Sequence, residues 1–273
     1  MKFDLLVPCR AEVGESPVWD GPANRLWWVD GPPGILYRLD LETRALAHWT
    51  FGRRLGSIAL TPDNRVLLAL RDGLHLFDPH TEELVFLVHP EPGGVDNFLN
   101  DGKVGPDGAF WIGSAGIAPD GGPAGALYRV LPDGTVTKRV SEVFTSNGLA
   151  WSADGKTMIH SDSRGQWIDR YRFDPATGEM SQRRRIATPG PADGRPDGGA
   201  FDRDDCYWSA GVSAGCVNRY AMDGTLLARY PMPALAPTMP CFGGPDMRHL
   251  FVTSLRRKDD ATDACGHLYW TTT

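Results

Sequence analysis

The sequence has no strong excess of charge of either sign. Its 28 lysines and arginines against 34 acidic residues give a formal net charge of −6, and the longest basic runs, 183–185 and 256–258, are three residues each. Nucleic acids and anionic membranes are bound through dense positive charge. We therefore expect neither as a partner.

Cysteine and long apolar runs are also scarce. Five cysteines, an odd number, lie far apart without a C-x-x-C pair, at positions 9, 206, 216, 241 and 265. This pattern indicates neither a disulfide framework nor a thiolate zinc site. The opening MKFDLLVPCRAE is too poor in apolar residues for a signal-peptide core, and no stretch reaches membrane-spanning length. We expect reduced thiols and a cytoplasmic protein.

Long stretches free of glycine and proline are also scarce. The 32 glycines and 22 prolines occupy about one position in five, which excludes a helical bundle. Hydrophobic residues nevertheless make up 41% of the chain, enough for a full core. The composition therefore points to many short strands.

A turn of the Pro-Asp-Gly kind followed by a short apolar or aromatic run recurs six times. The central residues of these runs are Trp28, Leu68, Trp111, Ile159, Trp208 and Val252. Their successive spacings are 40, 43, 48, 49 and 44 residues, which is typical of the blades of a β-propeller.

Each copy is followed by a second hairpin pattern, so that four short strands form each repeat. The sequence predicts an all-β, six-bladed propeller of four-stranded antiparallel blades, built as a single domain over residues 1–273. The last hairpin is short, and residues 3–9 are expected to supply its missing outer strand and close the ring. An open β-solenoid of the same repeat length is the alternative.

The start of each innermost strand should face the central channel of such a ring. Counting back 11 to 13 residues from the central positions reaches Glu15, Ser57, Asn100, Asn147, Asp197 and Cys241. Two carboxylates at a partly buried channel mouth repel each other unless a cation lies between them. Glu15 and Asp197, with the amide oxygens of Asn147 and Asn100, form an oxygen-rich set that suits Ca²⁺, Mg²⁺ or Mn²⁺, while Zn²⁺ and Fe²⁺ remain possible.

The same motifs also occur in ordinary turns. Gly-Glu-Ser-Pro, Asn-Asp-Gly and Asn-Gly suit tight turns, and asparagine before glycine often serves only a left-handed conformation. A turn requirement would not select Glu, Asn, Asn and Asp at equivalent inward positions. The recurrence therefore favours a site for one divalent metal ion that is open to water and substrate.

At these residues the sequence resembles the family of senescence marker protein, regucalcin and gluconolactonase, which are six-bladed propellers. The motifs occur in family order along the whole chain: GESPVW (14–19), LNDGKV (99–104), GALY (125–128), SNGL (146–149), HSDS (160–163), PDG (196–198), CFGG (241–244) and FVTS (251–254). The resemblance implies hydrolysis of a sugar lactone with one divalent ion held by Glu15, Asn147 and Asp197. It also implies that Asn100 contacts the substrate or a metal-bound water.

Two positions depart from the regucalcin-like pattern. Phe98 stands where those members have an arginine that binds sugar hydroxyls, and Ala118 stands where they have a glutamate that grips the sugar. The resemblance therefore supports the metal and the lactonase chemistry more than it supports gluconolactone as substrate. A smaller or less polar lactone, or another orientation of the sugar, remains open.

Lactone opening needs a nucleophilic water, a stabilised oxyanion and a proton for the leaving alkoxide. Asp197 is the candidate general base, Glu15 would hold the ion, and Asn147 would fix the ion and donate to the oxyanion. Attack by a metal-bound hydroxide is the alternative. Asp101 and Asp162 are candidates for the pocket wall, although either aspartate can equally cap a turn.

Three classes of function remain open at this point, because propellers serve all of them. They are a metal-dependent sugar lactonase of carbohydrate metabolism, a calcium- or metal-binding propeller without catalysis, and a protein-interaction scaffold. Hydrolysis of other lactones, esters or phosphotriesters is a subordinate enzymatic alternative. The sequence leaves the metal, the lactone and the oligomeric state undetermined.

Overall fold

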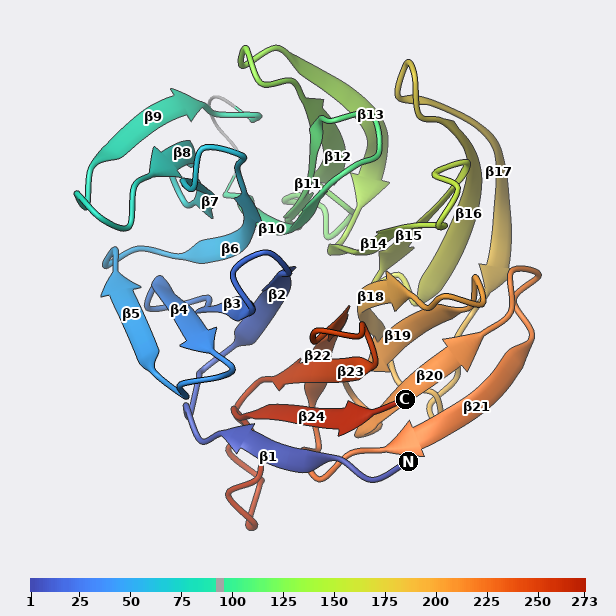
Figure 1. Ribbon diagram of the computed structural model, residues 1–273. Helices are drawn as coiled ribbons and strands as arrows, with labels where there is room; N and C mark the ends of the chain where they lie inside the picture. The colour runs from blue at the N-terminus through green and yellow to red at the C-terminus, as the bar shows by residue number, and fades with distance from the viewer. Residues whose placement is uncertain (92–95) are drawn as a thin grey trace.

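The computed structural model describes residues 1–91 and 96–273, which form a ring of six four-stranded sheets (Figure 1). Each sheet is one blade, and its strands run antiparallel from the channel outward. Blade 1 comprises β2 (Gly14–Asp20), β3 (Arg25–Asp30), β4 (Ile35–Asp40) and β5 (Leu46–Thr50). Blade 2 comprises β6 (Leu55–Leu60), β7 (Val66–Leu70), β8 (Gly73–Phe77) and β9 (Leu84–Val88).

The next three blades follow the same order along the chain. Blade 3 comprises β10 (Phe98–Val104), β11 (Phe110–Ala115), β12 (Gly125–Val130) and β13 (Val136–Val143). Blade 4 comprises β14 (Ser146–Trp151), β15 (Thr157–Asp162), β16 (Trp167–Asp174) and β17 (Glu179–Ala187). Blade 5 comprises β18 (Pro196–Phe201), β19 (Tyr207–Gly211), β20 (Cys216–Tyr220) and β21 (Leu226–Pro231).

Blade 6 closes the ring with strands from both ends of the chain. It comprises β22 (Pro237–Gly243), β23 (His249–Ser254), β24 (Leu268–Thr272) and β1 (Asp4–Val7). Strand β1 pairs antiparallel with β24, and Figure 1 shows the two termini on this blade. The predicted propeller and its closure by the N-terminal strand are therefore confirmed.

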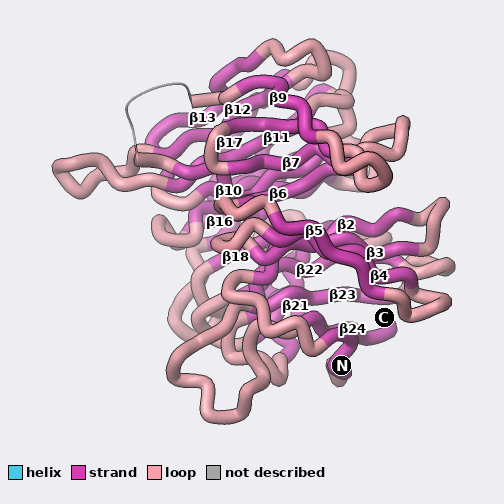
Figure 2. Tube along the Cα trace, turned by 90° about the vertical axis from the view of Figure 1, so that its left-hand side faces the viewer, coloured by secondary structure: helices cyan, strands magenta, loops and turns pink. Residues whose placement is uncertain are grey.

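The hydrophobic core lies between neighbouring blades. The six central residues predicted from the repeat all lie on the second strand of a blade, and each is buried. Trp111 of β11, for example, packs with Leu149 and Met158 of blade 4. Figure 2 shows the strands from the side, with the connecting loops projecting at both ends of the ring. No helix of the described residues is long and apolar enough to span a bilayer.

One irregularity recurs on the innermost strand of all six blades. The regular pairing with the second strand is interrupted between Glu15 and Val18, and at the corresponding point of every other blade: Leu55/Ile58, Leu99/Gly102, Asn147/Ala150, Pro196/Gly199 and Pro237/Pro240. A bulge of this kind redirects the side chains on either side of it. The repeated bulge therefore decides which residues face the channel.

Candidate metal and active site

Glu15 and Asn147 occupy the same position in the register of their blades. Glu15 pairs with Val29 and Asn147 with Ser161, each directly before the bulge. Asn100 and Asp197 lie one residue further along, since Leu99 and Pro196 hold the paired position. Four predicted polar residues thus start their strands at one rim of the ring, although at two different register positions.

Two further residues of the predicted inward set are placed differently. Cys241 pairs with Phe251 beyond the bulge of β22, so it is not equivalent to the others. Ser57 lies inside the bulge of β6, where its side chain is buried and its hydroxyl has no hydrogen-bond partner among the described residues. Equal spacing along the sequence therefore did not guarantee equal register.

The side-chain amide of Asn147 is held in one orientation by two neighbours. Its Nδ2 donates to Oγ of Ser163 at 2.6 Å, and the Ser163 hydroxyl donates in turn to the carbonyl oxygen of Pro196 at 2.5 Å. Its Oδ1 accepts from Nδ2 of Asn100 at 3.1 Å. A carbonyl-type oxygen has two lone pairs, so one remains for a cation. This arrangement suits a metal ligand better than a donor to an oxyanion.

The backbone of Asn147 and Gly148 bears on whether this Asn-Gly motif serves only a tight turn or also supplies a ligand. Gly148, and not Asn147, has the positive φ of 67°, and Oη of Tyr207 would lie 2.4 Å from a Cβ at Gly148. Only glycine meets both requirements. The left-handed conformation in this motif therefore explains the glycine and leaves the asparagine to be explained by its contacts.

Asn100 connects blades 3 and 4 at the channel. Its Nδ2 donates to the carbonyl oxygen of Ser146 at 2.9 Å as well as to Asn147. Both amide hydrogens are thereby used, because an amide nitrogen carries two. The side-chain oxygen of Asn100 is left as the acceptor available to a substrate hydroxyl or a water.

Asp197 is a buried carboxylate without a hydrogen-bond donor. Its exposed fraction is 7%, and no described residue donates a side-chain or backbone hydrogen bond to it. Burial raises its pKa, and the negative charge of Asp101 raises it further, while Arg195 lowers it. An unpaired buried carboxylate is costly unless a cation neutralises it.

Glu15 shares this environment. Its Oε2 accepts from the backbone N–H of Ser16 at 3.0 Å, the one described contact of the carboxylate. Burial raises its pKa well above the ordinary value, and the charges of Asp197 and Asp101 add to this rise. The charge of Asp197 therefore opposes the ionisation of Glu15, as the sequence predicted for two carboxylates at one site.

Lys103 is a charged channel residue that the sequence reasoning did not single out. Its Nζ donates to the carbonyl oxygen of Gly199 at 2.9 Å, and burial lowers its pKa while Asp101 and Glu15 favour its charged form. Burial raises the pKa of all three nearby carboxylates, those of Glu15, Asp101 and Asp197, so a cation bound among them would favour their ionised forms. The sequence could have indicated Lys103, because it directly follows Asn100, Asp101 and Gly102 in the Asn-Asp-Gly-Lys motif.

Asp101 and Asp162, the two candidates for the pocket wall, both bind backbone amides. Oδ2 of Asp101 accepts from the N–H of Leu149 at 3.0 Å, within the bulge of β14. Asp162 is 1% exposed and accepts from four backbone N–H groups, those of Phe144, Thr145, Arg164 and Gly165. The contacts of Asp162 are those of a cap. Oδ1 of Asp101 is buried and has no hydrogen-bond partner among the described residues, so a place in the pocket wall stays a prediction for it.

Phe98 and Ala118 lie at the same end of blade 3. Phe98 begins β10 and pairs with Ala115. The guanidinium of Arg54 stacks on its ring, with the central carbon 4.1 Å from the ring centroid. Ala118 lies in a turn after β11, where its N–H donates to the carbonyl oxygen of Gly122 at 2.9 Å. Ala118 offers a substrate no side-chain polar group.

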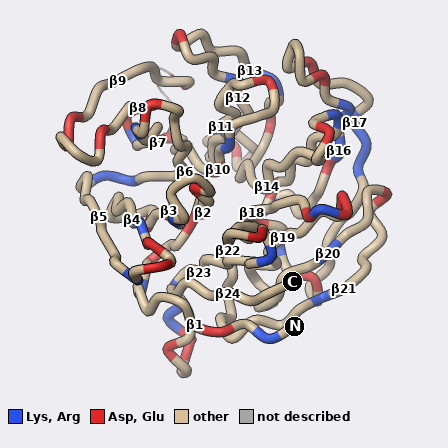
Figure 3. The backbone as a smooth tube through the Cα atoms, viewed as in Figure 1, with Lys and Arg blue, Asp and Glu red and all other residues tan. Residues whose placement is uncertain are grey.

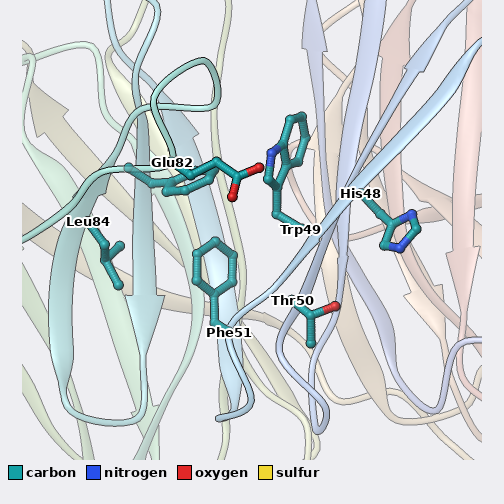
Figure 4. A pocket seen from close by; sticks show the side chains of 7 residues that line it. His48, Trp49, Thr50, Phe51, Glu82 and Leu84 are labelled. Atoms are coloured by element: carbon teal, nitrogen blue, oxygen red, sulfur yellow. The ribbon is translucent and has the colours of Figure 1, made fainter.

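The described residues contain no cluster of three or more His, Cys, Asp or Glu side chains placed to hold a metal. The candidate set differs in kind, since it has two carboxylates and an amide oxygen. A separate surface cleft of about 370 Å³ lies between blades 1 and 2, lined by His48–Phe51, Phe77, Glu82 and Leu84 (Figure 4). It contains none of the predicted site residues.

Comparison with known proteins gives one consistent result. The family model for the SMP-30/gluconolactonase/LRE-like region matches residues 13–256. A 6-deoxy-6-sulfogluconolactonase of Pseudomonas putida is 35% identical over 255 residues, covering 92% of this chain and 86% of the relative. A pentonolactonase of Haloferax volcanii is 30% identical over 280 residues, covering 98% and 94%. The crystal structure of a calcium-binding regucalcin from Agrobacterium tumefaciens is 30% identical, with a TM-score of 0.90 and coverage of 98% and 93%.

Proposed function

The chain belongs to the SMP-30/gluconolactonase/LRE-like family and is a lactone hydrolase, and from that premise we propose that it opens a sugar lactone to the aldonic acid with one divalent cation. The observation that carries the metal dependence is the pair formed by the buried Asp197 and the half-buried Glu15. Their pKa values are both raised, although the charge of Lys103 lowers that of Glu15 and the charge of Arg195 lowers that of Asp197.

The residues present fit a divalent cation. Glu15 and Asp197 would supply its charge balance, and Oδ1 of Asn147, oriented by Ser163, would supply a neutral ligand. Oxygen ligands of this kind suit Ca²⁺, Mg²⁺ or Mn²⁺, and Zn²⁺ or Fe²⁺ accept them also. When bound, the cation would polarise the lactone carbonyl as a Lewis acid. The calcium-binding relative makes calcium the first ion to test.

Asp197 is the proposed general base. Its carboxylate accepts no hydrogen bond from the described residues, and burial raises its pKa towards the working range of a base. It takes a proton from the water whose oxygen bonds to the carbonyl carbon. The bond from that carbon to the ring oxygen then breaks, and Asp197 returns the proton to the leaving alkoxide.

Asn100 and Lys103 have supporting roles in this proposal. The free Oδ1 of Asn100 accepts from a substrate hydroxyl, because both of its amide hydrogens are already donated to blade 4. The ammonium group of Lys103, fixed on the carbonyl of Gly199, lowers the pKa of Asp101 against the larger rise caused by burial. Asp101 accepts a hydrogen bond from Leu149 within the β14 bulge that directs Asn147.

The family relatives do not determine the substituents of the sugar. One named relative acts on a sulfonated gluconolactone and another on a pentonolactone. The proposal is therefore tested with a panel of aldonolactones of several ring sizes, following acid release. Protein stripped with a chelator is compared with protein restored with Ca²⁺, Mg²⁺, Mn²⁺ or Zn²⁺, and elemental analysis measures bound metal.

We expect no turnover after chelation and recovery with at least one ion at one equivalent per chain. Full activity in protein shown to be free of metal would refute the metal-dependent mechanism. A restored metal content without turnover on any lactone, ester or phosphotriester would instead favour the alternative of a metal-binding propeller without catalysis.

A further inference from the structure

Three arginines lie at the rim where blade 2 begins, and they differ in their partners. Arg53 forms an ion pair with Asp72 at 3.0 Å, and Arg71 forms one with Asp96. Within residues 1–91 and 96–273, Arg54 has no carboxylate partner and its side chain donates no hydrogen bond. The remaining residues, 92–95, have the sequence Pro-Gly-Gly-Val and carry no acidic side chain.

The guanidinium of Arg54 is half-buried and stacked on an aromatic ring. Its central carbon lies 4.1 Å from the centroid of Phe98. Burial lowers its pKa, and the positive charge of Arg71 acts in the same direction. Stacking occupies one face of the guanidinium and leaves its N–H donors, which point outward in the plane, free for an acceptor.

Arg54 belongs to the same rim as the candidate active site. It directly precedes β6, and Phe98 begins β10 two residues before Asn100. The two strands touch here, since a Cβ on Gly56 would lie 2.8 Å from the carbonyl oxygen of Asn100. The offset from Phe98 to Asn100 is about 7 Å along the strand. This distance is comparable with the length of the carbon chain of a single sugar. Figure 3 shows the stretch of basic residues that leads into β6.

We propose that Arg54, supported by Phe98, binds an anionic group of the substrate, so that this enzyme prefers lactones with a carboxylate, sulfonate or phosphate remote from the lactone carbonyl. The planar fork of an arginine matches these oxyanions with two parallel hydrogen bonds. An anion there supplies the charge partner that Arg53 and Arg71 have and Arg54 lacks. The proposal rests on the proposed lactonase function and names its substrate class.

The test compares two lactones that differ in one group. Gluconolactone ends in a hydroxymethyl group, and glucarolactone has a carboxylate in its place. We expect the wild-type protein, loaded with metal, to have the higher kcat/KM on glucarolactone. Arg54→Gln should lower that value about 10- to 100-fold, the usual loss for a charge-assisted hydrogen bond, and lower the value for gluconolactone less than about threefold. Arg54→Lys should recover only part of the loss, because a lysine lacks the fork.

Arg38 provides the matched control. Its guanidinium also stacks on aromatic rings, those of Trp27 and Trp49 in blade 1, away from the site rim. Arg38→Gln should leave the ratio of the two kcat/KM values unchanged. Equal losses on both lactones in Arg54→Gln, or an equal change of the ratio in Arg38→Gln, would assign Arg54 to packing alone and overturn the proposal.

Failure of the lactonase function is distinguishable from failure of this inference. Hydrolysis of gluconolactone with no preference for glucarolactone overturns the anion site and leaves the lactonase intact. If neither lactone is hydrolysed under any metal, titration calorimetry with glucarate, the ring-opened dianion, tests the site by itself. Binding to the wild type that Arg54→Gln weakens at least tenfold supports the site, and equal binding by both proteins overturns it.

Discussion

Blades 4 and 2 have the same backbone at the channel and opposite chemistry there. In blade 4 the residue before the bulge is Asn147, and in blade 2 it is Leu55, which is fully buried in the core. The second strand of blade 4 ends in Asp162, which binds four backbone N–H groups, whereas β7 is followed by Arg71, which pairs with Asp96.

The difference shows how a propeller distributes its functions. All six blades provide the same bulge, and the side chain placed at it decides whether the blade presents a polar group to the channel or only packs. Blade 1 resembles blade 4, because Asp30 binds the N–H groups of Glu12 and Val13 beside Glu15. Blade 2 instead presents Arg54, a residue before its inner strand, to the same rim. The predictions below compare polar sites in blades 4 and 5 with their counterparts in blade 2.

The largest expected effect follows from Asp197→Asn in blade 5. Loss of the general base should lower kcat at least about 100-fold, while the asparagine oxygen still permits metal binding at raised metal concentration. Steady-state kinetics and elemental analysis on the same samples check this. Unchanged turnover with intact metal binding would eliminate Asp197 as the base.

Ser57 is the control for that substitution. It lies in the bulge of blade 2, is buried, and its hydroxyl has no partner among the described residues. Ser57→Ala should change kcat less than about threefold, since a hydroxyl without a partner contributes little. A loss as large as that of Asp197→Asn would show that blade 2 takes part in the chemistry and would break the comparison.

The next effect concerns stability. Asp162→Ala leaves four backbone N–H groups without their acceptor, and we expect the free energy of unfolding to fall by about 3 kcal/mol. Arg71→Ala, at the corresponding end of β7, should change it by about 0.5 kcal/mol or less, because its ion pair is exposed. Urea unfolding of both variants measures the difference, and similar losses would remove the distinction between the two blade ends.

A smaller effect is expected where one hydroxyl orients the metal ligand. Ser163→Ala removes the acceptor for Nδ2 of Asn147 and should raise the Kd of the activating metal about tenfold. Ser161 is the matched control on the same blade, because its hydroxyl has no partner among the described residues. Metal titration should give Ser161→Ala the wild-type Kd. Equal shifts in both variants would show that orientation by Ser163 is unimportant.

The smallest effect is a pH dependence of stability from His160. Burial lowers the pKa of His160 from the ordinary 6.5 to about 3, with Asp169 acting against this shift and Arg183 in the same direction. A buried base with a lowered pKa stabilises the fold above pH 6.5, and that contribution is lost as the pH falls through 6.5 towards 3. Its slope is about 1.4 kcal/mol per pH unit.

His160→Ala gives blade 4 the side chain that blade 2 has at the corresponding position, Ala69. The variant is expected to be less stable overall, because it loses packing and the hydrogen bond to Ser146. The diagnostic readout is the difference between wild type and variant in urea unfolding at pH values from 6.5 down to 5. That difference should shrink as the pH falls, and a constant difference would show that His160 binds its proton equally well in the folded and unfolded states, so that burial does not lower its pKa.

Much of the candidate site was accessible from spacing. The positions of Glu15, Asn100, Asn147 and Asp197 follow from the repeat, because each lies at the start of an inner strand. The backbone contacts of Asp101 and Asp162 could not be predicted, since an aspartate beside a turn suits either a cap or a pocket wall. Two of the N–H groups that donate to Asp162 lie 17 and 18 residues away in sequence, and the one that donates to Asp101 lies 48 residues away. Only the folded chain brings these donors to the carboxylates.

The sequence by itself determined the number of blades, the antiparallel hairpins and the closing strand, because turns and alternating apolar residues are local and repeat along the chain. The tertiary structure decided the rest: the register on each side of the bulge, the orientation of the Asn147 amide by Ser163, and the stacking of Arg54 on Phe98. These depend on partners in neighbouring blades, and the direction of a side chain and the neutralisation of a charge are set by what lies near in space.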